Sequence, residues 1–323
     1  MRYFLIPFSF IYWLVISIRD FCYARHIFKE HKLGAKVISV GNITWGGTGK
    51  TPTVLLIAET LMKEGHRAAI LIRGYGNDEQ GLLSKLAGAT PVIVGKDRRR
   101  SGKEAIARYS LDTVLLDDGF QHKRLRRDLD IVCIDATDPF GNGCLIPAGS
   151  MREGLDGLKR ADIFLLTKVD LVRDQGMMKK LEEKLKKVNP GAIIVRSIHA
   201  PGYFYKLSNE QLVDIEAIKN KNIALVSAIG NPRSFEKTIL NLGLKFKRHF
   251  IFRDHHWYRE KELKKIEDYC TKNDIGIIIT TEKDAIKLRN TKCDIRYTAL
   301  HIELKIIENE QGFHSRLFRI YNS

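Results

Sequence analysis

A glycine-rich segment near the N-terminus constrains the fold of this chain more than any other feature. Residues 37–40 are a short apolar run of the kind that forms a buried parallel strand, and residues 53–63 carry apolar side chains at helical spacing. Glycines at positions 46, 47 and 49 and a Lys-Thr pair lie between them. This order of strand, glycine turn, Lys-Thr and helix predicts a phosphate-binding loop, in which backbone N–H groups at a helix N-terminus hold an anion.

The spacing of this loop differs from the common G-x-x-x-x-G-K-[ST] pattern, because Thr44 stands at the first glycine position. The alternative is a plain strand-to-helix turn that binds nothing. We favour nucleotide binding because the flanking strand and helix are the context that the motif requires. Lys50 is then expected to contact the β- and γ-phosphates, and the Thr51 hydroxyl to ligate Mg²⁺. The residues predicted to surround the nucleotide phosphates are Thr44, Trp45, Gly46, Gly47, Thr48, Gly49, Lys50 and Thr51.

Size and charge limit the domain number and the partners. The chain has 323 residues, enough for two domains of ordinary size, and 54 Lys and Arg against 38 Asp and Glu give a net charge of +16. This excess indicates an anionic partner, which is nucleic acid, an acidic membrane surface or a phosphorylated substrate, and charge does not choose among them. The five cysteines are scattered and form no C-x-x-C pair, which favours reduced thiols in a cytosolic setting over disulfides or zinc.

The first 32 residues differ from the rest of the chain. Residues 3–18 are almost wholly apolar and aromatic, yet this run is shorter than the span of about 20 residues that a bilayer requires and includes Pro7. A basic flank follows, without the small-residue site at which a signal peptide would be removed. We predict an in-plane membrane helix whose basic flank meets anionic headgroups, and the alternative is a helix packed on the protein's own core.

Charged residues follow several strand candidates. Asp117 and Asp118 end an apolar run, the pattern of a second, magnesium-binding strand beside a phosphate loop. Asp78 and Glu79 also follow a strand, where α/β proteins bind ligands, although their spacing alone favours helix capping. Arg98 lies in a run of cations that forms either a solvated turn or a phosphate site.

Strand and helix candidates alternate along the chain. This alternation predicts an α/β fold with a doubly wound, mostly parallel sheet like that of P-loop NTPases in residues 33–200. Residues 201–323 are predicted to form a second, smaller α/β domain that completes the active-site cleft. Asp254 and His255 follow a strand of this domain. A histidine there is usually structural, and the alternative is an imidazole oriented by a carboxylate for acid–base chemistry. Strands are expected at residues 37–40, 67–72, 91–94, 113–116, 130–134, 162–167, 192–198, 222–228, 245–252 and 276–281.

Residues 167–170, Thr-Lys-Val-Asp, are similar to the guanine-reading [NT]-K-x-D motif of GTPases. Four residues with one degenerate position occur often by chance. A GTPase or metallochaperone is therefore an alternative function, and it predicts selectivity for guanine nucleotides. A nucleic-acid-binding ATPase would fit the net charge but lacks a recognisable binding module. A membrane-attached nucleotide-binding scaffold would bind ATP without transferring phosphate.

Several segments together resemble the tetraacyldisaccharide 4′-kinase family of lipid A biosynthesis. The resemblance covers nearly the full length, including the apolar N-terminus, and Thr44 at the first glycine position is what this family shows. The segments are residues 41–52 (Gly-Asn-Ile-Thr-Trp-Gly-Gly-Thr-Gly-Lys-Thr-Pro), 73–75 (Arg-Gly-Tyr), 116–122 (Leu-Asp-Asp-Gly-Phe-Gln-His), 147–149 (Pro-Ala-Gly), 152–153 (Arg-Glu) and 254–255 (Asp-His).

The resemblance implies transfer of the γ-phosphoryl group of ATP to the 4′-hydroxyl of a tetraacylated glucosamine disaccharide 1-phosphate. It implies ATP and Mg²⁺ as cofactors and a location at the cytoplasmic face of the inner membrane, where the peripheral protein meets its lipid A precursor on an anionic surface. It implies neither nucleic acid nor an obligate protein partner.

The resemblance also assigns roles to individual residues. Asp78 is implied as the base that accepts the proton of the sugar hydroxyl, with His255 orienting it and Lys50 on the phosphates. The family pattern departs here, because Asn77 and Gln80 stand where it has Gly and Pro. The implied metal ligands are Thr51, Glu79, Asp117 and Asp118, and the residues implied toward substrate or phosphate are Arg98, His122 and Arg152.

Overall fold

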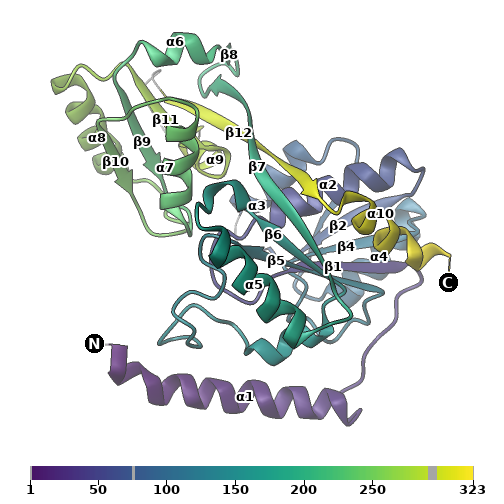
Figure 1. Ribbon diagram of the computed structural model, residues 1–323. Coiled ribbons are helices and arrows are strands. Elements are labelled where there is room, and N and C mark those ends of the chain that lie inside the picture. The colour runs from purple at the N-terminus through teal and green to yellow at the C-terminus, as the bar shows by residue number, and fades with distance from the viewer. Residues whose placement is uncertain (1, 75–76, 290–296, 323) are drawn as a thin grey trace. The chain divides into compact units, whose positions relative to one another are not determined.

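The computed structural model describes residues 2–74, 77–289 and 297–322, and for residues 2–3, 77–80 and 82 it describes the backbone alone. Contacts divide the chain into two compact units (Figure 1). Unit 1 comprises residues 1–75, 83–198 and 304–323, and unit 2 comprises residues 76–82 and 199–303. The three-part division at residues 32 and 200 stays a prediction. Residues 304–323, at the C-terminus, make most of their contacts with unit 1 and therefore belong to it.

Unit 1 alternates strands and helices as expected. Its strands are β1 (Lys36–Gly41), β2 (Ala68–Ile72), β3 (Val92–Val94), β4 (Thr113–Asp117), β5 (Leu129–Asp135), β6 (Ile163–Thr167) and the first part of β7 (Ile193–Lys206). Its helices are α2 (Lys50–Lys63), the last part of α3 (Asn77–Leu86), α4 (Arg98–Tyr109), η2 (Leu155–Arg160), η3 (Val169–Leu171), α5 (Gln175–Val188), α10 (Glu310–Phe318) and η4 (Arg319–Tyr321).

The sheet of unit 1 is parallel and doubly wound, as predicted. Its strand order is β7-β6-β5-β1-β4-β2-β3, and all six of these neighbouring pairs are parallel. β2, β4, β5 and β6 are buried along their whole length because helices cover both faces. α2 and α10 pack on one face, where Ile57 and Phe313 share a core cluster with Ile131, and α5 packs on the other, where Leu181 shares a cluster with Val132 (Figure 1).

Unit 2 is a smaller α/β layer. Its strands are β8 (Leu212–Val213), β9 (Ile223–Ser227), β10 (Arg248–Ile251), β11 (Ile277–Thr281) and the first part of β12 (Tyr297–Glu308), and its helices are α6 (Ile215–Lys219), α7 (Pro232–Asn241), α8 (Glu260–Lys272) and α9 (Glu282–Arg289). β10, β9, β11 and β12 lie side by side and parallel. α7 covers one face and α8 the other.

Most predicted strands match in position, and a few differ in length. β10 spans only four residues, fewer than the run predicted at 245–252. β7 extends to Lys206, well past the predicted end at residue 198, because its second half belongs to unit 2. β12 and α10 were not predicted. The chain leaves unit 1 within β7 and returns to it within β12.

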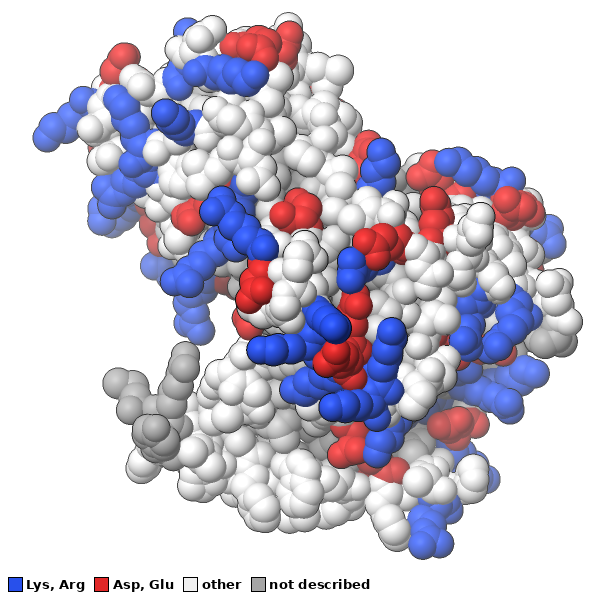
Figure 2. Space-filling model, viewed as in Figure 1, with Lys and Arg blue, Asp and Glu red and all other residues white. Residues whose placement is uncertain are grey.

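The N-terminal helix α1 (Ile6–Ala24) follows the short turn η1 (Arg2–Leu5) and is longer than the apolar run predicted it to be. Its 19 residues are long and apolar enough to cross a membrane by length and composition alone, so the argument that the segment is too short to span was wrong. Large apolar side chains such as Phe10, Ile11 and Phe21 are more than half exposed, which excludes the alternative of a helix packed in the core. The helix carries only two charged residues, and Figure 2 shows its side as an almost uncharged strip.

Polar contacts fix α1 to the body of unit 1. Ser9 Oγ donates to the carbonyl of Leu145 at 2.9 Å, and Tyr12 Oη donates to the carbonyl of Arg152, also at 2.9 Å. Farther along the helix, Asp20 pairs with the buried Lys123 at 2.8 Å. The apolar side chains therefore remain exposed while the polar ones hold the helix in place.

Candidate active site

The phosphate-binding loop lies at the carboxyl end of β1, the central strand of unit 1. β1 ends at Gly41 and α2 begins at Lys50. Gly49 caps the helix with a φ of 87°, in the left-handed region that favours glycine, and Gly46 has a φ of 127°. The backbone N–H groups of the first turn of α2 are left without partners inside the helix, as an anion site requires.

Acidic and basic side chains meet at the mouth of this loop. Lys50 Nζ lies 3.7 Å from Asp118 Oδ1. Arg152 holds the same carboxylate with two hydrogen bonds, at 2.5 and 2.8 Å, and its guanidinium lies 5.7 Å from the ring centroid of Trp45. Although burial opposes ionisation, these cations hold the pKa of Asp118 well below its usual range. The carboxylate is therefore ionised at physiological pH.

A second layer of polar side chains supports the loop from behind. Gln121 Nε2 donates to the carbonyl of Asn42 and to Glu153, each at 2.7 Å. Glu153 is buried and accepts a further bond from Arg160 at 2.8 Å. Arg152 also donates to the side chains of Asn42 and Gln121 at 3.2 Å. This network ties the 116–122 and 152–153 segments to the loop.

Arg98 does not lie in a solvated turn. It is the first residue of α4, whose cap is Asp97, and it is buried. Its guanidinium donates to the backbone carbonyls of Asp117 and Asp118, the latter at 3.0 Å. Arg98 therefore supports the acidic segment through its backbone.

His122 lies beside the same cluster. Burial, reinforced by Arg98 and other arginines, lowers the pKa of its imidazole to about 4. Its buried Nε2 has no hydrogen-bond partner among the described residues. The imidazole is therefore neutral at physiological pH.

The candidate Mg²⁺ ligands lie close to the loop. Asp117 is the last residue of β4 and pairs in register with Val40 of β1, and Thr51 lies in the first turn of α2. Within the described part of the chain, no group of three or more His, Cys, Asp or Glu side chains could hold a metal by itself. In general, one or two protein carboxylates and substrate phosphates share a Mg²⁺ ion.

In unit 2, His255 lies at the carboxyl ends of the strands. Its N–H donates to the carbonyl of Ala228, just after β9, and its φ is 61°. Asp254 Oδ1 is 3.9 Å from His255 Nε2, too far for a hydrogen bond, so Asp254 does not orient the imidazole through this nitrogen, and an acid–base role of His255 stays a prediction. Lys283 Nζ lies between them instead, 3.1 Å from Asp254 Oδ1 and 3.0 Å from His255 Nε2.

The side chains of Asp78 and Glu79 lie outside the described residues. Their backbone belongs to the first turn of α3, which begins at Asn77. Their predicted roles as base and metal ligand stay predictions.

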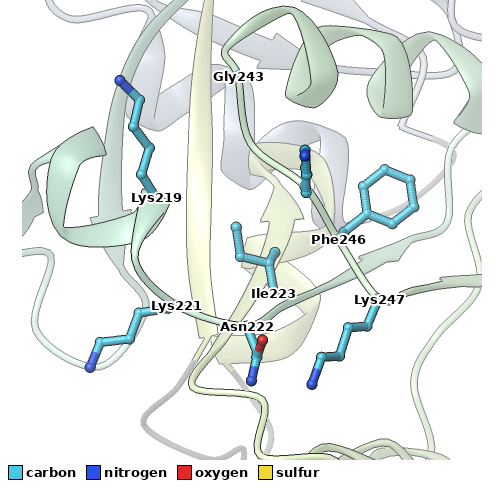
Figure 3. Close-up of a pocket in the computed structure, with 8 residues that line it drawn as sticks. Lys219, Lys221, Asn222, Ile223, Gly243, Phe246 and Lys247 are labelled. Carbon is cyan, nitrogen blue, oxygen red and sulfur yellow. The ribbon is translucent and has the colours of Figure 1, made fainter.

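A pocket of about 360 Å³ in unit 2 is lined partly by lysines (Figure 3). Its position and the contacts of these lysines do not indicate a ligand-binding site. The pocket opens at the amino end of β9, whereas ligands of α/β sheets bind at the carboxyl ends. Figure 3 shows the side chain of Lys219 pointing toward the top of the view and those of Lys221 and Lys247 pointing toward the bottom. Lys219 pairs with Glu216, and Lys247 donates to the carbonyl of Asn273.

Comparison with known proteins decides the family. The sequence profile of the tetraacyldisaccharide-1-P 4′-kinase family, LpxK, matches residues 1–322. The tetraacyldisaccharide 4′-kinase of Elusimicrobium minutum is 36% identical over 319 residues, covering 91% of this chain and 84% of that protein. The tetraacyldisaccharide 4′-kinase of Bdellovibrio bacteriovorus is 33% identical over 340 residues, covering 99% of this chain and 98% of that protein.

The protein belongs to the tetraacyldisaccharide 4′-kinase family. A crystal structure described as the "apo" form of LpxK from Aquifex aeolicus in complex with ATP matches with a TM-score of 0.73 and 29% identity, covering 99% of both chains. Membership of this family supports a kinase over the GTPase alternative drawn from residues 167–170. The α/β fold predicted from the sequence is likewise that of the family.

Several residues of the site were not predicted. Asn42, Gln121 and Glu153 stand inside the family segments, and Asn42 and Glu153 are buried, where polar side chains need hydrogen-bond partners. Lys283 follows the end of β11, where its position alone could have indicated a ligand-side residue. Its pairing with residues 254 and 255 required the fold.

Proposed function

We propose that this protein transfers the γ-phosphoryl group of ATP to the 4′-hydroxyl of a tetraacyldisaccharide 1-phosphate. The full-length family match carries this proposal, because it joins a named reaction to a loop of the right chemistry. In the step, the 4′-oxygen forms a bond to the γ-phosphorus, the bond from that phosphorus to its bridging oxygen breaks, and ADP leaves.

The loop supplies the phosphate contacts. Lys50 and the first amides of α2 would hold the β- and γ-phosphates, as expected of a helix N-terminus. Thr51 and Asp117 would hold Mg²⁺, which neutralises phosphate charge when bound. An ionised Asp118 between Lys50 and Arg152 supports this assignment, because its negative charge suits a cation at the same mouth.

The proton of the sugar hydroxyl would pass to the carboxylate of Asp78. Two observations support this assignment: α3 begins just after the carboxyl end of β2, and His255 lies at the carboxyl end of the unit 2 strands. His255, held by Lys283, would orient Asp78. Such general-base help is worth about 10²- to 10⁴-fold in rate.

The acceptor is a lipid, and α1 fits a lipid surface. We infer that the protein binds the cytoplasmic face of the inner membrane through the exposed apolar side chains of α1, with its net positive charge attracted to anionic headgroups. A substrate embedded in the membrane would then meet a protein whose phosphate-binding loop is on the same unit as α1.

The deciding experiment measures ³²P transfer from γ-labelled ATP to the purified disaccharide 1-phosphate in detergent. Wild-type protein should label the lipid. Lys50→Ala should abolish labelling, and Lys63→Ala, an exposed lysine at the other end of α2, should not change it. ATP binding without labelled lipid would contradict the proposed acceptor.

The base assignment has its own test. Asp78→Asn should lower kcat by about 10²- to 10⁴-fold while leaving ATP affinity close to wild type. Asp156→Asn, a highly exposed carboxylate in η2, serves as the control. Near-normal turnover of Asp78→Asn would remove Asp78 from the mechanism.

A further inference from the structure

Thr167 and Lys168, the first two residues of the segment that is similar to a guanine-reading motif, contact the phosphate-binding loop. β6 ends at Thr167, a fully buried residue whose Oγ1 donates to the backbone carbonyl of Thr48 at 3.0 Å. Lys168 follows, and its Nζ donates to the carbonyl of Gly47 at 2.8 Å. Two consecutive side chains thus hold two consecutive carbonyls of the loop.

The contact is built into the core. Lys168 is only 4% exposed, and its ammonium pairs with Asp135 Oδ2 at 2.5 Å, at the end of β5. Asp135 is itself fixed by the N–H and the hydroxyl of Thr137, at 3.0 and 2.6 Å. Lys168 adopts a φ of 57°, a conformation uncommon for residues other than glycine, and strain of this kind gathers at functional sites.

The two contacts set the direction of the loop amides. In a trans peptide the C=O and the following N–H point in opposite directions. Holding the Thr48 carbonyl toward β6 therefore turns the N–H of Gly49 the other way, at the N-terminus of α2 where the phosphates would bind. The Thr48 hydroxyl is held from a third side by Asn42 Nδ2 at 2.8 Å.

We propose that Thr167 and Lys168, neutralised by Asp135, are positioning residues that hold the loop in its ATP-binding shape. This assignment rests on the proposed ATP-dependent function and gives the 167–168 dipeptide a role that needs no guanine base. Thr167 and Lys168 act through the loop backbone. Their contacts therefore affect the affinity for the nucleotide and leave the acceptor site unchanged.

The test compares Thr167→Val with Thr113→Val in the full chain. Both threonines are fully buried in strands of unit 1, but Thr113 lies at the opposite, amino end of β4, where its hydroxyl contacts Asp112 and Tyr321. We expect Thr167→Val to weaken ATP binding, measured by calorimetry, by about fivefold to tenfold, the effect of one lost hydrogen bond. Thr113→Val should keep wild-type ATP affinity even if its melting temperature falls as much as that of Thr167→Val.

Two further readouts separate positioning from general stability. Amide hydrogen exchange without nucleotide should speed up at residues 46–51 in Thr167→Val and stay unchanged there in Thr113→Val. In the transfer assay, Thr167→Val should raise KM for ATP and leave KM for the lipid within about twofold. Lys168→Met, if it folds, should weaken ATP binding further than Thr167→Val.

Equal ATP affinity for Thr167→Val and wild type, or an equal loss in Thr113→Val, would overturn the proposal. Because calorimetry and hydrogen exchange need no lipid acceptor, these outcomes remain distinguishable from a failure of the proposed phosphate transfer.

Discussion

At the scale of single residues, chemistry in this protein depends on which neighbours a side chain has. Asp118 is ionised because Lys50 and Arg152 surround it, whereas burial among cations keeps His122 neutral. Both residues stand in the segment 116–122. That one is charged and the other neutral therefore depends on burial and on the cations that surround each side chain.

The neutral state of His122 predicts a pH dependence of stability. The pKa of this histidine is about 4 in the folded protein against an ordinary value of 6.5, so between these values the unfolded chain binds more protons. The contribution of His122 to the free energy of unfolding should be constant above about pH 6.5 and should fall as the pH drops toward 4. We expect His122→Asn to lose less stability than wild type between pH 7.5 and pH 5, measured by urea unfolding.

His26→Asn, an exposed histidine after α1, should behave as wild type in the same series. If the unfolding free energies of wild type and His122→Asn ran parallel across this range, His122 would not be the titrating group.

At the scale of elements, the close approach of β1 to the segment after β4 fixes the base of the loop. A Cβ at Gly41 would lie 2.5 Å from Phe120 Cβ and 2.7 Å from its backbone nitrogen, and Phe120 is fully buried. Backbone must shift to accept it, so we expect Gly41→Ala to lower the free energy of unfolding by about 1–3 kcal/mol. Gly34→Ala, where a Cβ meets nothing within 4 Å, is the control, and thermal unfolding of both variants is the measurement. Equal melting temperatures would show that the segment accommodates the methyl group.

The exposed apolar side chains of α1 lead to a prediction about membrane binding. Ile11 is 57% exposed and touches no described core cluster, so Ile11→Glu should fold normally but place a charge on the apolar surface. We expect sedimentation with lipid vesicles to drop, because a carboxylate enters the lipid interface only at a cost. Ile307→Glu, an equally apolar and 48% exposed position on β12, should sediment as wild type. Equal losses in both variants would place the membrane contact elsewhere.

At the scale of the whole molecule, net charge adds a long-range term to membrane binding. An excess of 16 positive charges attracts anionic lipid, and salt screens this attraction. Raising the salt from about 0.05 to about 0.5 M should therefore weaken binding to anionic vesicles strongly and to zwitterionic vesicles little. Salt-independent binding to both would assign the attachment to the apolar side chains of α1 alone.

The sequence by itself determined the parts of this protein whose signals are local. A strand, a glycine turn and a helix follow one another within residues 37–63, so the phosphate-binding loop and the parallel α/β fold were predictable from period and order. The positions of the loop residues, and of Asp117 at the end of its strand, were predictable for the same reason. β12 escaped prediction, and its residues divide between the two units.

Only the tertiary structure decided which of these residues act together. Arg152 reaches Asp118 across 34 positions, Lys168 reaches Gly47 across 121, and Lys283 reaches Asp254 across 29. In unit 1 such partners are set by the order of strands in the sheet, which places the carboxyl ends of β1, β4, β5 and β6 next to one another. Local propensity specifies that a strand forms and where it ends, but the pairing of strand ends depends on how the whole core packs. The sequence therefore determined the chemistry that was present, and the fold decided which carboxylate met which cation.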